Sequence, residues 1–293
     1  MGEAVVDALG RHLGLPRTPT RVVSLVPSET ETIACLLGAQ VVVGRTRYCE
    51  HAPDAVVVGG TKDPDVEAVC ALAPDLVLAN KEESGRKATE ALMAAGLTVH
   101  VSFPTTAFES VAYVERLARL VGVPDHPLPP QLRRVVGAAA ADARAGVPVF
   151  VPIWKEPWMS FDGRTFASDM LELAGGQNVV ADRPRRYPLA ADLGRRPALD
   201  ASRVGDRDTR YPRLTLAEVR DREPALVLLP DEPYDFDEDD EETLRGALAG
   251  VPTARVSGKH LFWYGAHVSK AIPALRHAIA AGVPSRRRER HET

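Results

Sequence analysis

Cys49 and His51 form a Cys-x-His pair, and these residue types at this spacing are typical of metal ligands. A thiolate and an imidazole suit zinc and other borderline metals. A closed structural zinc site needs four ligands, and the sequence has no Cys-x-x-Cys or His-x-x-x-His pair to complete one. His260, His267 or Glu82 would have to supply the remainder. In a different role, His51 alone would ligate the metal of a bound corrinoid or haem.

Aromatic side chains gather where the sequence predicts strand ends and the loops that follow them. The chain has three tryptophans, and all of them fall in such places in its second half. A flat ligand such as a corrin or a porphyrin offers faces on which these rings stack in offset geometry. The alternative is that the rings pack at the lobe interface or in a loop core. The candidate rings are Tyr48, Trp154, Trp158, Tyr187, Tyr234, Trp263 and Tyr264.

Charged side chains stand on the same loops. Lys62, Lys81 and Lys155 would bind carboxylate, amide or phosphate oxygens of a ligand, although solvation is the usual fate of a surface lysine. Glu82 and Glu232 are the acidic candidates at these strand ends. Together with the rings, these residues predict a binding site for a bulky cofactor with polar substituents.

Catalytic chemistry has weaker support in this sequence. Ser28 follows an apolar strand and opens a helix, but the Gly-x-Ser-x-Gly pattern of a nucleophile elbow is absent. A metal-dependent hydrolase built on Cys49, His51 and acidic partners is the remaining catalytic alternative, and its ligand set is incomplete. We therefore predict a protein that binds rather than an enzyme.

The stretch 130–146, PQLRRVVGAAAADARAG, is the element that organises the rest. Proline opens it and glycine closes it, as at the two ends of a helix, and alanine has the best helix propensity. On both sides, apolar runs of four to six residues alternate with helical segments, which predicts parallel sheets covered on both faces. The expected fold class is α/β: two parallel-sheet lobes joined by a single rigid helix.

The domain boundaries follow from this pattern. We expect an N-terminal extension with a short helix at 1–20, an N-terminal lobe at 21–123, a linking helix at 124–146, a C-terminal lobe at 147–283 and a basic tail at 284–293. The helix after the first strand would begin with a capping box formed by Ser28 and Glu31. The segment 182–213 is rich in Arg, Asp and Pro and lacks periodicity, so it predicts a lid or binding loop.

Composition excludes several classes of function. The 293 residues are 45% apolar and 26% charged with a net charge of −4, which is typical of a water-soluble globular protein and gives no reason to expect nucleic acid as a partner. No apolar run approaches the roughly 20 residues that span a bilayer. Glu3 and Asp7 interrupt the first residues, which do not resemble a signal peptide. Because three cysteines imply no disulfide framework, we expect a cytoplasmic protein.

Two stretches carry a family resemblance. RVVSLVPSETETIACLLGA at 21–39 and VVGGTKDPDVEAVCALAPDLVLAN at 57–80 resemble the start of the class III substrate-binding proteins of ABC importers. These are the cobalamin, haem and siderophore-iron receptors, also called helical-backbone metal receptors, and the cobalamin-binding type is the most similar. The resemblance extends over roughly 21–282. It implies two α/β lobes, a stiff linking helix and a ligand held in the cleft between the lobes.

The resemblance also implies a function. The chain would bind a metal-containing cofactor or metal chelate without catalysis, with a corrinoid favoured and haem or siderophore-iron as alternatives, and would deliver it to an ABC permease. The implied ligand residues are Tyr48, His51, Lys62, Lys81, Glu82, Trp154, Lys155, Trp158, Glu232, Tyr234, Trp263 and Tyr264.

Permease docking is the feature on which this sequence departs from the family. Family members place one exposed carboxylate on each lobe, and Glu67 stands seven residues before Pro74 as that pattern asks. In the second half, the seventh residue before Pro224 is Ala217, and Glu218 is the next residue along the chain. A shift of one residue turns a helical side chain by about 100°. Family members are also exported. The alternative is a cytoplasmic binder or sensor of a metal or cofactor that is not linked to transport.

Overall fold

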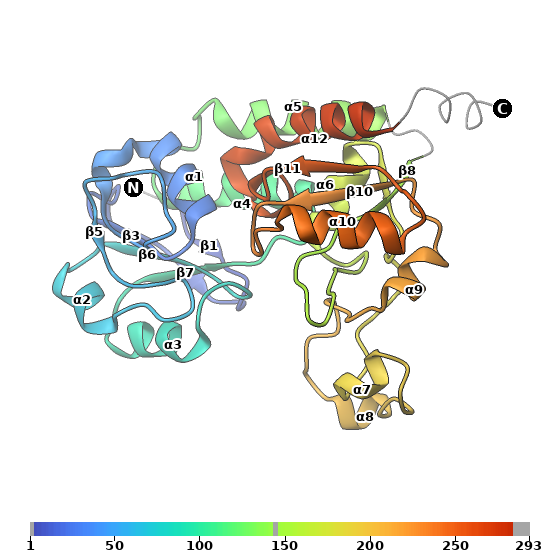
Figure 1. Cartoon of the computed structure of the whole chain (residues 1–293). Coiled ribbons are helices and arrows are strands. Elements are labelled where there is room, and N and C mark those ends of the chain that lie inside the picture. Colours follow the sequence, from blue (N-terminus) through green and yellow to red (C-terminus); the bar gives the residue numbers. More distant parts are fainter. Residues whose placement is uncertain (1–2, 143–145, 284–293) are drawn as a thin grey trace. The chain divides into compact units, whose positions relative to one another are not determined.

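Two parallel β-sheets organise the chain, described here from a computed structural model for residues 3–142 and 146–283 (Figure 1). The contacts divide the chain into two compact units. The first comprises the described residues up to Val135 together with Trp263–Ser269, and the second comprises the others. The predicted α/β class with two parallel-sheet lobes is confirmed.

The first unit is built on a five-stranded sheet in the order β5-β4-β3-β6-β7, in which every neighbouring pair is parallel. Its strands are β3 (Val22–Ser24), β4 (Val42–Arg45), β5 (Val56–Val57), β6 (Leu76–Asn80) and β7 (Val99–Ser102). All residues of β3, β6 and β7 are buried, because helices cover both faces of the sheet. This is why these strands are mostly apolar in the sequence, although β7 contains His100 and β6 ends at Asn80.

Four helices cover the two faces of this sheet. Figure 1 shows α2 (Val66–Ala71) and α3 (Arg86–Ala94) on one face and α1 (Pro27–Leu37) and α4 (Ala107–Leu120) on the other. Side chains of Asp65 and Thr106 cap α2 and α4. The capping box predicted at Ser28 is wrong, because α1 begins at Pro27 after Val26, without a side-chain cap. The short 3₁₀ helices are η1 (Ala39–Val41) and η2 (Gly265–His267).

The N-terminal extension is an antiparallel hairpin, β1 (Val5–Val6) and β2 (His12–Leu13), and not the short helix that the sequence predicted. The carboxylate of Asp7 accepts hydrogen bonds from the backbone N–H groups of Leu9 and Arg11, which favours a turn over a helix. The N–H of Ala8 donates to the carbonyl of Val101 at 2.9 Å. The extension therefore covers the edge strand β7, which would otherwise expose unpaired backbone groups.

The second unit is built on a four-stranded parallel sheet in the order β11-β10-β8-β9. The strands are β8 (Val147–Phe150), β9 (Gly176–Asn178), β10 (Leu226–Pro230) and β11 (Thr253–Val256). Strand β9 reads Gly-Gln-Asn, which has neither apolar side chains nor β-branched residues, so the sequence alone did not indicate it.

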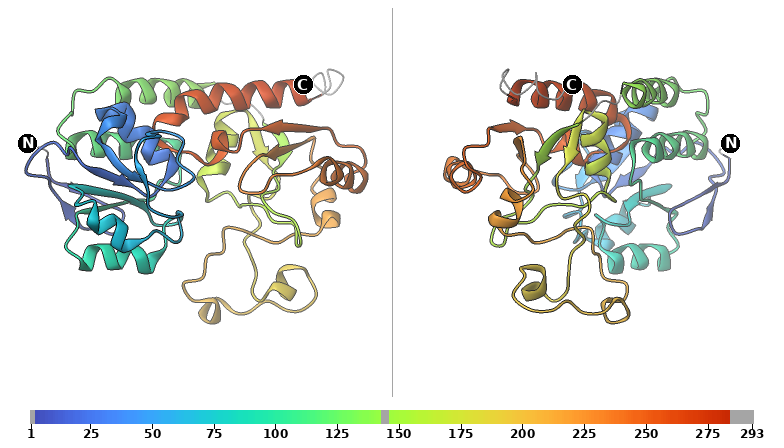
Figure 2. Two further views of the ribbon diagram at one scale, coloured as in Figure 1. Left: turned by 60° about the vertical axis from the view of Figure 1, so that its left-hand side comes forward. Right: turned by 90° about the vertical axis from the view of Figure 1, so that its right-hand side faces the viewer.

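Helices again cover both faces of this second sheet. Val219 of α9 (Leu216–Arg220) and Leu244 of α10 (Glu238–Ala247) pack against Val227 and Leu229 of β10. Figure 2 shows α10 on one side of the sheet and α6 (Phe166–Leu173) on the other. Helix α11 (Lys259–Phe262) packs on α6, and the end of α12 (Val268–Gly282) reaches Leu226. Helix α10 begins with a capping box formed by Asp237 and Asp240.

The segment 182–213 is the predicted long loop, and its helices are only four residues long: α7 (Leu189–Asp192) and α8 (Ala201–Val204). Figure 1 shows both helices well apart from the sheet of their own unit. The buried guanidinium of Arg183 holds the base of the loop, with an ion pair to Asp192 at 2.8 Å. Its role as a lid stays a prediction.

Helix α5 (Leu128–Ala141) is the predicted linking helix, and the boundary between the units falls within it, after Val135. The predicted end at Gly146 follows Ala143–Ala145, which lie outside the described residues. The single link is a correction, because the chain returns to the first unit at Trp263–Ser269 and leaves it again. The reason is chemical: Tyr264 and His267 bind side chains of α1.

The longest helices are α12 with 15 residues and α4 and α5 with 14 each. Through 3–142 and 146–283, no helix is long and apolar enough to cross a membrane.

We predict that Asp7→Ala lowers the free energy of unfolding by about 2–4 kcal/mol. Burial raises the pKa of the Asp7 carboxyl, but hydrogen bonds from Arg11 and the backbone outweigh burial and hold the pKa below its usual value. The contribution of Asp7 is therefore present at neutral pH and is lost as the pH falls through the lowered pKa. Urea unfolding at pH 7 measures it, with the exposed Asp54→Ala as the control. An equal loss of unfolding free energy in both variants would contradict a stabilising role for the hydrogen bonds of Asp7.

Candidate functional site

Four aromatic rings of the second unit pack into one group, which we call the Trp154 cluster: Trp154, Trp158, Tyr234 and Phe236. The ring of Trp154 meets Tyr234 edge-on at 5.2 Å between centroids, and Tyr234 lies 4.8 Å from Phe236. Trp158 stacks on Phe236 at 6.0 Å, with 9° between the planes. Three of these rings were predicted from the sequence, and the structure brings them together.

Two strands position the Trp154 cluster. Trp154 and Trp158 follow β8 in a turn closed by a bridge between Trp154 and Met159, while Tyr234 and Phe236 follow β10. Because β8 and β10 are parallel neighbours, their carboxyl ends lie at one edge of the sheet, which is the usual place for a ligand. Trp154 is 46% exposed, so its ring is open to a ligand, whereas the other rings brace it.

The charged side chains that were predicted to bind a ligand in this unit are less accessible to it than the Trp154 ring. The ammonium group of Lys155 donates to Asp240 at 2.6 Å and lies 5.6 Å from the centre of the Tyr234 ring. The hydrogen bond to Asp240 raises the pKa of Lys155. Glu232 is half-buried and lies close to Gly258. A Cβ added to Gly258 would lie only 2.6 Å from the carbonyl oxygen of Glu232. Lys155 is therefore a partner of Asp240 and not an unpaired cation.

In the first unit, the loops after β4, β5 and β6 hold Tyr48, Lys62, Lys81 and Glu82. Tyr48 is 59% exposed, and the exposed Lys62 donates a hydrogen bond to the Glu82 carbonyl, which joins two of the loops. The ammonium group of Lys81 lies 5.3 Å from the centre of the Phe103 ring. These groups are accessible, and their contact with a ligand stays a prediction.

The sulfur of Cys49 is buried and hydrogen-bonded in the first unit, which does not favour its use as a metal ligand. Its side chain is 4% exposed, and its sulfur accepts a hydrogen bond from the Thr30 hydroxyl at 3.0 Å, with the Thr46 hydroxyl at 3.1 Å. Among the residues that the structure describes, no group of three or more His, Cys, Asp or Glu side chains is placed to hold a metal. The described residues therefore do not supply the ligand set that a zinc site or a metal-dependent hydrolase needs. Axial ligation by the half-buried His51 stays a prediction.

Trp263 and Tyr264 differ from the prediction in their location. Both belong to the first unit, and they are 7% and 3% exposed. The Tyr264 hydroxyl donates to Glu29 at 2.8 Å and accepts from the Asn80 amide at 3.0 Å. His267 is also engaged, because its ring contacts Glu31 at 2.9 Å. These side chains stabilise the unit, so a ligand reaches Tyr264 only if this network opens.

Glu29 is the residue that sequence analysis missed at this place. Its carboxyl is fully buried and accepts hydrogen bonds from the Ser102 and Tyr264 hydroxyls. Burial raises the pKa of Glu29 to about 8, so the group is mostly protonated at neutral pH. The sequence carries no direct signal for this role, because the burial of the first turns of α1 is decided by the tertiary structure.

The two predicted docking carboxylates differ in the structure. Glu67 is exposed in the first turn of α2. Glu218 accepts a hydrogen bond from the Arg183 guanidinium at 2.6 Å, and its side chain is 28% exposed. Arg183 is itself 2% exposed and paired with Asp192, so Glu218 belongs to a buried ion network. Docking through Glu218 stays a prediction, and in the structure this carboxylate neutralises Arg183.

Sequence analysis also missed a cationic group on the loop 182–213. The guanidinium groups of Arg185 and Arg207 lie 4.4 and 5.3 Å from the centre of the Tyr187 ring. The sequence analysis did not select either arginine, because both lie in a stretch without periodicity. The Arg-x-Tyr spacing of Arg185 and Tyr187 was the available signal. Guanidinium groups held in this way suit carboxylate or phosphate groups of a ligand.

Comparison with known proteins agrees with this architecture. Residues 22–204 match the family model described as "Periplasmic binding protein". A vitamin B12-binding protein of Yersinia pseudotuberculosis serotype O:1b is 30% identical over 193 residues, which cover 63% of this chain and 69% of that protein. The chain is similar in structure to the apo periplasmic heme-binding protein RhuT of Roseiflexus sp. RS-1, with a TM-score of 0.71, 19% identity and coverage of 89% of this chain and 98% of that one. For the periplasmic vitamin B12-binding protein BtuF of Vibrio cholerae the TM-score is 0.64, with 17% identity and coverage of 91% and 99%.

We predict that Glu29→Gln removes a pH dependence of stability. The pKa of Glu29 is raised in the folded protein, so its favourable contribution is complete below the unfolded pKa of about 4.5 and is lost as the pH rises through about 8. At pH 9 the variant should therefore be more stable than the wild type. The gain is at most about 1.4 kcal/mol for each unit by which the pKa of Glu29 differs between the folded and the unfolded protein. Urea unfolding at pH 6.5 and pH 9 measures it. The exposed Glu67→Gln is the control, and a variant that tracks the wild type at both pH values would refute the raised pKa.

Proposed function

Because the chain belongs to the periplasmic binding protein family, we propose that it binds a bulky metal-containing ligand as the substrate-binding component of an ABC importer. The family binds small ligands, associates with ABC permeases and is not catalytic. The observation that carries the proposal is the Trp154 cluster, in which an exposed indole is braced by further rings at the carboxyl edge of a parallel sheet.

The chemistry of the Trp154 cluster favours a flat or partly flat ligand. An exposed indole held edge-on by Tyr234 has a fixed orientation, so stacking on it costs little side-chain entropy. A corrinoid or a haem presents such a face. We favour the corrinoid because a curated relative that is 30% identical is named a vitamin B12-binding protein, while similar solved structures include heme-binding proteins.

Each unit, taken by itself, carries cationic side chains that suit polar substituents of a ligand. Lys62 and Lys81 are exposed on the loops of the first unit, and Arg185 and Arg207 flank Tyr187 in the second. Guanidinium and ammonium groups bind carboxylate, phosphate and amide oxygens. These residues suit the propionates of a haem and the amide and phosphate groups of a corrinoid.

We predict that Trp154→Ala weakens ligand binding about 5- to 150-fold, which corresponds to about 1–3 kcal/mol for the loss of one stacked ring. Cobalamin and haem are titrated separately into the wild type and the variant and followed by absorbance. Phe108→Ala is the control, because Phe108 is 51% exposed on α4 and lies outside the cluster. Equal affinities in all three proteins would remove the role of Trp154, and no binding of either ligand would remove the proposed function.

A second candidate is a cytoplasmic binder or sensor of the same ligand class that serves no transporter. Two observations favour it. Glu218, the docking carboxylate expected on the second unit, is engaged by Arg183. Cys35, Cys49 and Cys70 are free thiols, and free thiols are typical of reducing compartments.

Fractionation of native cells separates the two candidates. For the cytoplasmic binder we expect the protein with the soluble cell contents and no labelling of the exposed Cys35 by a membrane-impermeant maleimide until the cells are lysed. Recovery with the cell envelope, or labelling of Cys35 in intact cells, supports the importer component and contradicts the second candidate.

A further inference from the structure

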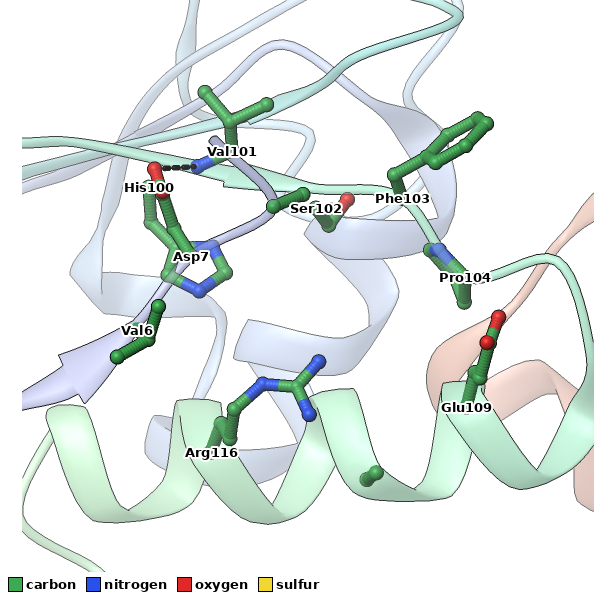
Figure 3. Close-up of a pocket in the computed structure, with 11 residues that line it drawn as sticks. Val6, Asp7, His100, Val101, Ser102, Phe103, Pro104, Glu109 and Arg116 are labelled. Atoms are coloured by element: carbon green, nitrogen blue, oxygen red, sulfur yellow. Dashed lines mark hydrogen bonds between the residues drawn. The ribbon is translucent and has the colours of Figure 1, made fainter. Parts of the chain in front are cut away.

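A pocket lined only by residues of the first unit lies beside the edge strand β7, and no residue of the Trp154 cluster contributes to it (Figure 3). Its volume is about 460 Å³, which admits a small organic molecule. Three elements form its walls: the N-terminal hairpin, β7 with the residues after it, and α4. The lining residues on which the argument rests are Val6, His100, Val101, Phe103, Glu109 and Arg116.

His100 is the first unusual group of the pocket. The residue is 1% exposed, and neither ring nitrogen has a hydrogen-bond partner in the part of the chain that the structure describes. A buried polar atom without a partner costs roughly 1–3 kcal/mol, so such atoms are rare in folded proteins. Burial lowers the pKa of His100 to about 4, so the neutral ring carries one N–H donor and one acceptor nitrogen.

Arg116 is the second unusual group. It is half-buried on α4, its side chain extends from α4 toward β7 (Figure 3), and it makes no hydrogen bond or ion pair with another described residue. The other charged groups around the pocket are already satisfied. Asp7 pairs with Arg11, and Glu109 accepts hydrogen bonds from the N–H and hydroxyl of Thr105 at 2.7 and 2.8 Å. Arg116 is thus a cation that faces the pocket without an anion.

We propose that this pocket binds a small organic carboxylate, whose carboxylate pairs with Arg116 and hydrogen-bonds the ring N–H of His100. A guanidinium group binds a carboxylate through two parallel hydrogen bonds. Val6, Val101 and Phe103 supply apolar walls for the body of the acid, which an inorganic anion would leave unfilled. The ring nitrogens of His100 are buried, whereas Val6 is exposed and Arg116 is half-buried.

The test uses the full chain and Arg116→Gln, with Arg119→Gln as the matched control because Arg119 is an exposed arginine on the same helix. Butyrate and benzoate are the probes, and butylamine and inorganic phosphate are the comparison compounds. Calorimetry should show binding of at least one acid to the wild type and to Arg119→Gln, weakened at least tenfold in Arg116→Gln. In protein labelled with ¹⁵N-histidine, the acid should shift one ring resonance, which is absent from His100→Gln.

Several outcomes would overturn the proposal: no binding of either acid, equal loss in the two arginine variants, or phosphate or butylamine binding as tightly as the acids. Unfolding curves of Arg116→Gln show whether the variant is folded. Its affinity for cobalamin or haem should equal that of the wild type, because this pocket excludes the Trp154 cluster. The carboxylate site and the proposed transport ligand therefore succeed or fail separately.

Discussion

The hydrogen bond between Tyr264 and Glu29, which are 235 residues apart, is the interaction on which the first unit depends. It fixes the returning segment Trp263–Ser269 against α1, together with the contact of His267 with Glu31 and the donation from the Gly265 N–H to Ser110. A carboxyl at this depth is tolerable because it is protonated and hydrogen-bonded. The chain therefore cannot be two lobes joined once, since the end of the sequence completes the core of its beginning.

Buried charged groups of the second unit are likewise paired. Arg183 is buried between Asp192 and Glu218, and Lys155 is paired with Asp240. A buried guanidinium without its carboxylates would carry a large desolvation cost, so Glu218 is committed to the fold. What remains open to a ligand is mainly aromatic: Trp154, held at a fixed angle by Tyr234.

Two kinds of binding chemistry thus occur on one chain. The Trp154 cluster offers stacking surface at the carboxyl edge of a parallel sheet, which suits the bulky ligands of the periplasmic binding protein family. The pocket beside β7 offers the guanidinium of Arg116 and the imidazole of His100, neither of which has a polar partner among the described residues, and both suit a small acid. The N-terminal hairpin lines that pocket and also covers the edge of the sheet.

The sequence by itself determined the α/β class, most strands and helices, and the gathering of Trp154, Trp158 and Tyr234 at strand ends. These follow from apolar periodicity and from the rule that parallel strands end at one edge, both of which are local or topological. Only the tertiary structure decided that Cys49 is a hydrogen-bonded core thiol, that Tyr264 binds Glu29 and that Glu218 neutralises Arg183. The physical reason is that the partner of a buried polar group is chosen by distance in space, and the partners of Tyr264 lie 162 to 235 residues away in the chain.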